Sequence, residues 1–159
     1  MIYEVKKKFE PISVAHRNWL HKGHCRFIHG YAREVEVIIR AKTLDKYGHV
    51  YDFGYFKEFR LWLKHLWDHS TLIASDDPYL KDLKKLEENE VIKLHIMDVS
   101  KGYFPNMEGC CRFLSDKLIP YISQRTDKRA WLHKVNIYEH ELNRGSLINE
   151  KENFKLDRS

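Results

Sequence analysis

The chain opens with two runs in which apolar and polar positions alternate, the pattern that predicts β-strands. The first run covers residues 1–16. Pro11 interrupts it, and because proline cannot donate to a strand ladder it predicts a bulge or an edge position. The second run covers residues 27–44 and has valine and isoleucine on one face. We expect the two runs to pair as an antiparallel hairpin.

Two later segments carry apolar residues at spacings of three and four, which predicts amphipathic helices. The first follows Asp52, a suitable N-cap, and its stripe is Phe56, Phe59, Leu63 and Leu66. The second opens at Pro105, and we expect Pro120 to kink or end it. Its stripe is Cys111, Leu114 and Leu118. Residues 70–90 look variable and predict one short helix, from Leu80, Leu83 and Leu86.

Residues 91–97 and 132–141 alternate again and predict the third and fourth strands. Glu139 shares a face with Val135 and Ile137, and a carboxylate on an apolar face is costly unless it is paired or binds a ligand. Strands joined by helices on one face of an antiparallel sheet give an α+β fold. We expect one domain over residues 1–143 and a polar tail over 144–159.

Composition narrows the function classes. The 159 residues carry a net charge of +5, which suits an anionic small substrate. The sequence has no basic run with interleaved aromatic residues, the pattern typical of nucleic-acid binding, so we expect no nucleic-acid partner. Three cysteines, two of them adjacent, favour a reducing compartment and so a cytoplasmic protein. We find no apolar run long enough for a membrane span, and expect no membrane partner.

Residues 24–31 contain the highest concentration of potentially reactive side chains. Cys25 precedes His29 by four residues, and His29 and Tyr31 fall on the same face of a strand. Pairing with the first strand can bring His16 to the same place. A thiol near clustered imidazoles can act as a base or nucleophile, although a strand with a buried cysteine and chance histidines would look the same.

The chain resembles the 6-pyruvoyltetrahydropterin synthase and 6-carboxytetrahydropterin synthase family. The resemblance extends from about residue 9 to residue 145. The motifs that carry the resemblance are, in chain order, Ala15-His16, Cys25-x-x-x-His29-Gly30, Val50-x-Asp52-Phe53, Asp68-His69, Pro105-x-x-Glu108 and Tyr138-Glu139. Three positions depart from the family pattern. Tyr31 and Asn106 stand where the family has histidine and threonine, and His140 stands where it usually has threonine.

The resemblance implies a tunnelling fold, with a four-stranded antiparallel sheet and two helices packed on one face. It also implies self-association, commonly a homohexamer of two trimers, with active sites between subunits. The cofactor implied is Zn²⁺ and the substrate is 7,8-dihydroneopterin triphosphate. The reaction is elimination of triphosphate by a lyase.

The resemblance also assigns residue roles. It implies that Cys25 removes a proton, that Asp68 orients His69 for proton transfer, and that Glu139 anchors the pterin ring. It places Glu108 and Asn106 among the substrate-binding residues. Its metal ligands fall on His16, His29 and Tyr31.

Two questions stay open at the level of sequence. A phenol binds zinc well only when it is ionised. Tyr31 therefore binds as phenolate, gives way to another imidazole such as His21 or His24, or leaves a weak or empty site in which it acts as a hydrogen-bond donor. We expect a divalent metal to be bound, more weakly than by three histidines. The product is 6-carboxy-5,6,7,8-tetrahydropterin of the 7-deazaguanine and queuosine pathway, which we favour, or the 6-pyruvoyl compound. Tyr31 also motivates a third reading, a pterin- or purine-binding protein without catalysis.

Overall fold

The sheet is built around one long strand, β3 (His29–Ala41). The computed structural model describes residues 1–150. The other strands are β1 (Tyr3–Lys8), β2 (Ile12–His16), β4 (Ser70–Ala74), β5 (Leu94–Met97), β6 (Ala130–His140) and β7 (Asn143–Ile148). Their order is β5-β4-β2-β3-β6-β7, and β1 pairs with the far half of β3 beyond β2. Strand β3 is therefore hydrogen-bonded to β1 and β2 on one side and to β6 on the other.

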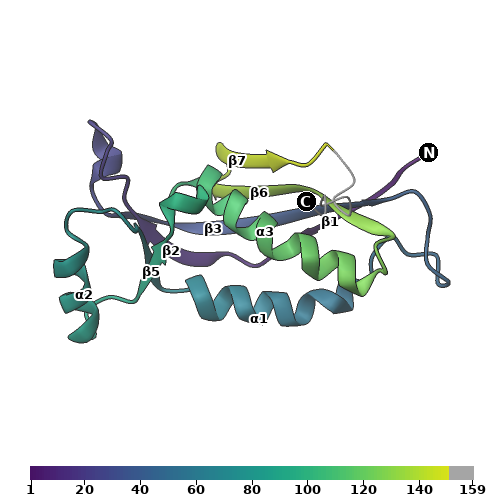
Figure 1. Cartoon of the computed structure of the whole chain (residues 1–159), viewed down its shortest axis with the longest axis horizontal. Coiled ribbons are helices and arrows are strands. Elements are labelled where there is room, and N and C mark those ends of the chain that lie inside the picture. Colours follow the sequence, from purple (N-terminus) through teal and green to yellow (C-terminus); the bar gives the residue numbers. More distant parts are fainter. Residues whose placement is uncertain (151–159) are drawn as a thin grey trace.

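Two long helices cover one face of this sheet. They are α1 (Phe56–Trp67) and α3 (Met107–Arg125), whereas the shorter α2 (Leu80–Glu88) lies beside β5 at one end (Figure 1). Short 3₁₀ turns occur at His24–Arg26, Phe53–Tyr55 and Val99–Lys101. None of the helices within residues 1–150 is long and apolar enough to cross a membrane.

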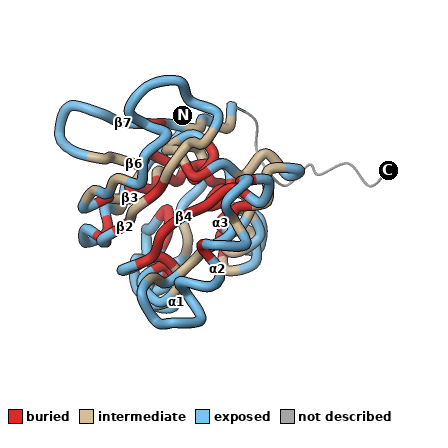
Figure 2. The backbone as a smooth tube through the Cα atoms, turned by 90° about the vertical axis from the view of Figure 1, so that its left-hand side faces the viewer, coloured by how far each residue is buried: buried red, intermediate tan, exposed pale blue. Residues whose placement is uncertain are grey.

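The core lies between the sheet and the two long helices, where Figure 2 shows most of the buried residues. The alternating face of β3 is buried there as predicted, with Val35, Val37 and Ile39 no more than 1 % exposed. Helix α3 contributes a second apolar row, and of the two effects predicted for Pro120, a kink or an end, the end does not occur, because the helix continues to Arg125. Pro120 is itself exposed, while Leu118 and Ile122 on either side of it are fully buried, so tertiary packing holds the helix across the proline.

The α+β class is confirmed, but the prediction of four antiparallel strands and two helices is wrong. Residues 1–150 contain seven strands and three α-helices. Strand β4 was missed because all five of its residues are buried, which removes the alternation that marks a half-exposed strand. It pairs in parallel with both β2 and β5, so the sheet is mixed. Pro11 separates β1 from β2, which we had taken for one interrupted strand.

The predicted polar tail begins inside an ordered strand. Residues 143–148 form β7, which pairs with β6 in antiparallel fashion. Gly145 is buried there, and a Cβ atom at this position would lie only 2.5 Å from the Cβ of Met107. The strand is thus pressed against the start of α3, a contact that depends on tertiary packing and leaves no local sequence signal. Residues 151–159 of the predicted tail lie outside the described residues.

The start of α3 is fixed by a side-chain cap and a close backbone contact. The Asn106 side chain accepts a hydrogen bond from the amide of Gly109 (2.9 Å). A Cβ atom at Gly109 would lie 2.2 Å from the backbone nitrogen of Phe104. The glycine thus allows the turn at 104–106 to lie directly on the helix, which directs the Pro105 carbonyl toward β3.

We predict that Gly109→Ala destabilises the protein by about 1–3 kcal/mol or more, because the new methyl group would overlap backbone atoms that cannot move aside. The intrinsic helix preference for alanine opposes this loss and is smaller. Urea unfolding measures the effect, with Gln124→Ala at an exposed position of the same helix as the control. Equal stability of the two variants would contradict the close contact.

Candidate active site

Antiparallel pairing of β2 with β3 brings the predicted ligand residues together. His16 lies opposite His29, and Val14 lies opposite Tyr31. The ring centroids of His16 and His29 are 4.3 Å apart, and that of Tyr31 lies 6.3 Å from His16 and 5.7 Å from His29. The proximity predicted from the hairpin is confirmed. The three rings lie at the end of the core face, beyond the part that the helices cover.

Glu139 reaches the same cluster from β6. Its side chain is 11 % exposed, on the same face as Val135 and Ile137, as its parity predicted. Its Oε1 atom accepts a hydrogen bond from Nη2 of Arg33 (3.3 Å) and lies 3.6 Å from Nε2 of His16. The costly position of this carboxylate is thus compensated by a buried guanidinium.

Arg33 is the site residue that the sequence analysis missed. It is 1 % exposed, on the inward face of β3 between Tyr31 and Val35. Its guanidinium donates to Nδ1 of His16 (2.8 Å), to Glu139 and to the Pro105 carbonyl (3.2 Å). The sequence feature that could have identified Arg33 is its inward position on an alternating strand. A charged side chain is buried at such a position only when it is paired with other polar groups.

The environment of His16 keeps its imidazole neutral. Burial, followed by the positive charge of Arg33 and the neighbouring His29, lowers the pKa of His16 to about 3. The contact between His16 and Glu139 is therefore not an ion pair near neutral pH. Instead, Arg33 supplies the positive charge that faces Glu139.

The predicted catalytic pair Asp68 and His69 lies elsewhere on the subunit. Asp68 Oδ1 accepts from the amide of Ser13 (3.0 Å), a bond that is the main reason why the pKa of Asp68 is lowered. Asp68 Oδ2 lies 3.2 Å from Nδ1 of His69, as expected for an orienting carboxylate. Ser13 precedes His16 by three residues, so the pair lies about 10 Å along β2 from the ring cluster. The His69 side chain is 81 % exposed.

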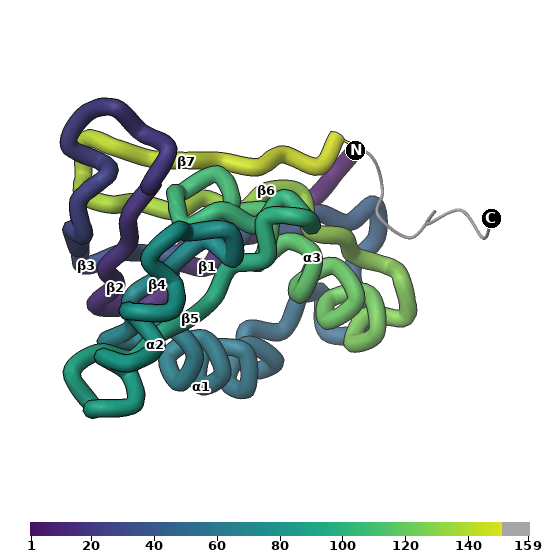
Figure 3. The backbone as a smooth tube through the Cα atoms, turned by 60° about the vertical axis from the view of Figure 1, so that its left-hand side comes forward, coloured from purple at the N-terminus to yellow at the C-terminus, as the bar shows by residue number. Residues whose placement is uncertain are grey.

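The remaining predicted residues lie on the loop before β3 and at the start of α3. Cys25 is an exposed free thiol in the 3₁₀ turn that precedes β3. Asn106 uses its side-chain oxygen to cap α3, and Glu108 is exposed in the first turn of that helix. The loop between β2 and β3 and the turn between β6 and β7 lie at the same end of the molecule (Figure 3). The ring centroid of His140, the last residue of β6, lies 6.0 Å from that of Tyr31.

The chemistry of these donors does not fit a zinc site with three protein ligands. Nδ1 of His29 faces the Phe27 carbonyl (2.7 Å) and must donate, which leaves its Nε2 free to bind a metal. Nδ1 of His16 and of His140 instead accept hydrogen bonds, which places the proton of a neutral ring on Nε2. Residues 1–150 contain no group of three or more His, Cys, Asp or Glu arranged to hold a metal. The zinc expected from the resemblance stays an untested prediction.

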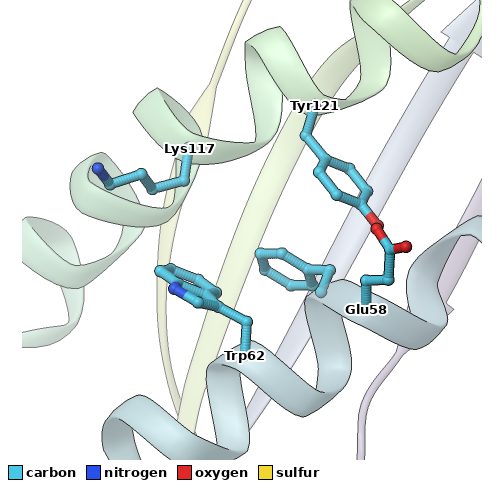
Figure 4. A pocket seen from close by; sticks show the side chains of 5 residues that line it. Glu58, Trp62, Lys117 and Tyr121 are labelled. Atoms are coloured by element: carbon cyan, nitrogen blue, oxygen red, sulfur yellow. The ribbon is translucent and has the colours of Figure 1, made fainter.

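A concave region lies between α1 and α3, and none of the predicted site residues lines it. Glu58, Phe59, Trp62, Lys117 and Tyr121 line a hollow of about 350 Å³, in which Trp62 projects from α1 and Tyr121 from α3 (Figure 4). The hydroxyl of Tyr121 donates to the Tyr55 carbonyl. The hollow has no imidazole or thiol in its lining, so we assign the candidate chemistry to the His16 cluster.

Comparison with known proteins supplies the family. A sequence model of the family described as 6-pyruvoyl tetrahydropterin synthase matches residues 4–150. The chain belongs to the 6-pyruvoyl tetrahydropterin synthase family. The resemblance drawn from the short motifs is thereby confirmed.

Relatives of this synthase family have been named for a specific product. A Rickettsia conorii protein named 6-carboxy-5,6,7,8-tetrahydropterin synthase is 30 % identical over 112 residues, covering 69 % of this chain and 77 % of its own. The protein of the same name from Rickettsia typhi is 28 % identical over 125 residues, covering 78 % and 85 %.

Solved structures of low identity share the fold of this family member. An uncharacterized protein from Wolinella succinogenes gives a TM-score of 0.80 at 20 % identity, covering 94 % of this chain and 99 % of its own. A Plasmodium vivax 6-pyruvoyltetrahydropterin synthase variant gives 0.68 at 17 % identity, covering 92 % and 97 %. At these identities the similarity supports the fold alone.

The neutral imidazole of His16 predicts a pH dependence of stability. Its pKa in the folded protein, about 3, lies below the ordinary value of 6.5, so the unfolded chain binds the extra proton first as pH falls. The stabilisation is fully present above about pH 6.5 and is lost toward the folded pKa. Between pH 7 and pH 5 we expect His16 to cost up to about 2 kcal/mol of unfolding free energy.

Urea unfolding of wild type and His16→Gln at both pH values measures this contribution. The variant should lose less stability on acidification. Burial, with Lys93, lowers the pKa of His95 as well, but His95 contributes to both proteins and cancels in the difference. The same pH slope in both proteins would show that His16 is not held neutral by the fold.

Proposed function

We propose that the chain is a lyase that converts 7,8-dihydroneopterin triphosphate into 6-carboxy-5,6,7,8-tetrahydropterin, in the 7-deazaguanine and queuosine pathway. The observation that carries the proposal is the convergence of His16, His29, Tyr31 and Glu139 at one end of the sheet in a member of this family. The name of the Rickettsia relatives supports the choice of product.

The proposed reaction uses Glu139 of this cluster, Cys25 of the loop before β3, and the separate pair Asp68 and His69. Glu139 accepts hydrogen bonds from the amino group and ring NH of the pterin, which fixes the ring in one orientation. Cys25, on the exposed loop before β3, takes the proton from the side-chain carbon next to the ring. Asp68 orients His69 for proton transfer on the other side. Triphosphate then leaves, and one water molecule is consumed as acetaldehyde is released and the 6-carboxy group forms.

Self-association completes this proposal, since Asp68 and His69 lie about 10 Å along β2 from the ring cluster of their own subunit. We propose that this exposed imidazole serves the site of a second copy. Within residues 1–150, β5 and β7 end the sheet and have one unpaired edge each. We therefore propose a homohexamer in which neighbouring sheets pair and sites form between subunits. Cys25, Cys110 and Cys111 are free thiols, which supports a cytoplasmic location.

Incubation with 7,8-dihydroneopterin triphosphate, followed by mass analysis of the pterin, tests the proposed reaction. The 6-carboxy compound is the expected product, and the 6-pyruvoyl compound would assign the other activity of the family. A second candidate function, a pterin- or purine-binding protein without catalysis, is favoured by Tyr31 at a ligand position. Tight pterin binding without release of triphosphate would establish that function.

We predict that Cys25→Ala abolishes elimination and leaves affinity for a bare pterin close to that of wild type, because the thiol acts on the side chain rather than the ring. Rate assays and calorimetry on the same preparation separate the two effects. Equal losses of rate and binding would assign Cys25 a structural role.

We predict that Glu139→Gln weakens binding of a bare pterin by about 1.5–3 kcal/mol, because the amide presents an NH₂ group where the ring also donates. Calorimetry measures the change. Glu34→Gln is the matched control, since Glu34 lies on the same sheet but pairs with Lys8 away from the cluster. Unchanged affinity of Glu139→Gln would limit Glu139 to its ion pair with Arg33.

A further inference from the structure

The guanidinium of Arg33 lies beneath the ring cluster and is held from several sides. Nη2 contacts His16 and Glu139, and Nη1 donates to the Pro105 carbonyl and to Sγ of Cys110 (3.5 Å). Nε is buried and has no hydrogen-bond partner within residues 1–150. A buried charge with one unpaired N–H is costly, so this residue does more than fill space in the core.

The direction of the bond between Arg33 and His16 is fixed by chemistry. A guanidinium has donors and no acceptor, so Nδ1 of His16 must supply the lone pair. The proton of the neutral ring is then on Nε2, which lies 3.6 Å from Oε1 of Glu139. Neither nitrogen of His16 has a lone pair left for a metal ion.

The positive charge of Arg33 also opposes metal binding at His16. The guanidinium is always protonated and stands within hydrogen-bond distance of the imidazole that would bind the metal, so it repels a divalent cation there. His29 is the imidazole of the cluster whose Nε2 is free, and Tyr31 adds a phenol. One imidazole and one phenol fall short of a catalytic zinc site.

We propose that Arg33 is a positioning residue that caps His16 and thereby keeps divalent metal from the His16, His29 and Tyr31 cluster. In this chain the fixed cation of the site is an arginine side chain, which aligns the Glu139 carboxylate and the His16 imidazole. This inference goes beyond the proposed function, because metal binding is measured on the protein without substrate.

The test is a titration of chelator-treated full-length protein with Zn²⁺ by calorimetry and with Co²⁺ by visible absorption. Four proteins are compared: wild type, Tyr31→His, Arg33→Met, and the double variant. Arg129→Met is the control for loss of an arginine that donates to backbone carbonyls, those of Thr43 and Val50, at the far end of the sheet. Circular dichroism confirms that each variant is folded.

We expect wild type, Tyr31→His and Arg129→Met to bind no stoichiometric zinc and to show no tetrahedral Co²⁺ spectrum. The double variant should bind one metal per chain at least on the order of tenfold more tightly than Tyr31→His, since it has three imidazoles and no cap. Stoichiometric zinc in wild type would overturn the proposal. Equal zinc affinity of Tyr31→His and the double variant would overturn it too. If Arg33→Met and the double variant fail to fold, Tyr31→His decides: a tight site in it refutes the capping role, and its absence supports it.

Discussion

Strand β3 is the constraint on which the rest of the structure depends. It is hydrogen-bonded to β1, β2 and β6, so its register fixes which side chains of four strands share a face. In its central part, Val35 and Val37 are buried beneath the helices. Its first residues, His29 and Tyr31, lie on the same face of the strand. The same alternation of inward- and outward-facing side chains along β3 therefore supplies residues to the core and, farther along the strand, to the candidate site. A slip of one residue would turn both to the opposite face.

The boundary between core and site is where polar side chains become buried. Arg33, His16 and Glu139 form a connected group that contains one cation, one neutral ring and one carboxylate. Each member lowers the cost of burying another, since the guanidinium compensates the carboxylate and donates to the imidazole. The group receives a further contact from the Pro105 carbonyl, which the capped and closely packed start of α3 holds in place. The arrangement of the site therefore depends on backbone packing more than 70 residues away along the chain.

The same group is the basis of the proposal that this family member keeps most motifs of the family and lacks its metal site. The positions of His16 and His29 preserve the family pattern, whereas Tyr31 and Arg33 change which lone pairs and charges the cluster presents. Ligand identity alone would still suggest a metal, because two imidazoles remain adjacent. In our proposal the partner of each ring nitrogen decides against a metal, since only a nitrogen without a proton or a hydrogen bond can bind an ion.

The sequence by itself determined the family, the α+β class, the amphipathic helices and the shared face of His29 and Tyr31, because these depend on local periodicity and short motifs. It also indicated that Glu139 needed a partner. Only the tertiary structure decided which partner that is, since Arg33 is 106 residues away and meets Glu139 through the pairing of β3 with β6. Strand β4 could not be predicted for a related reason: a strand buried on both faces shows no alternation of apolar and polar residues. The tautomer of His16 is likewise set by Arg33, a neighbour in space that no local pattern encodes.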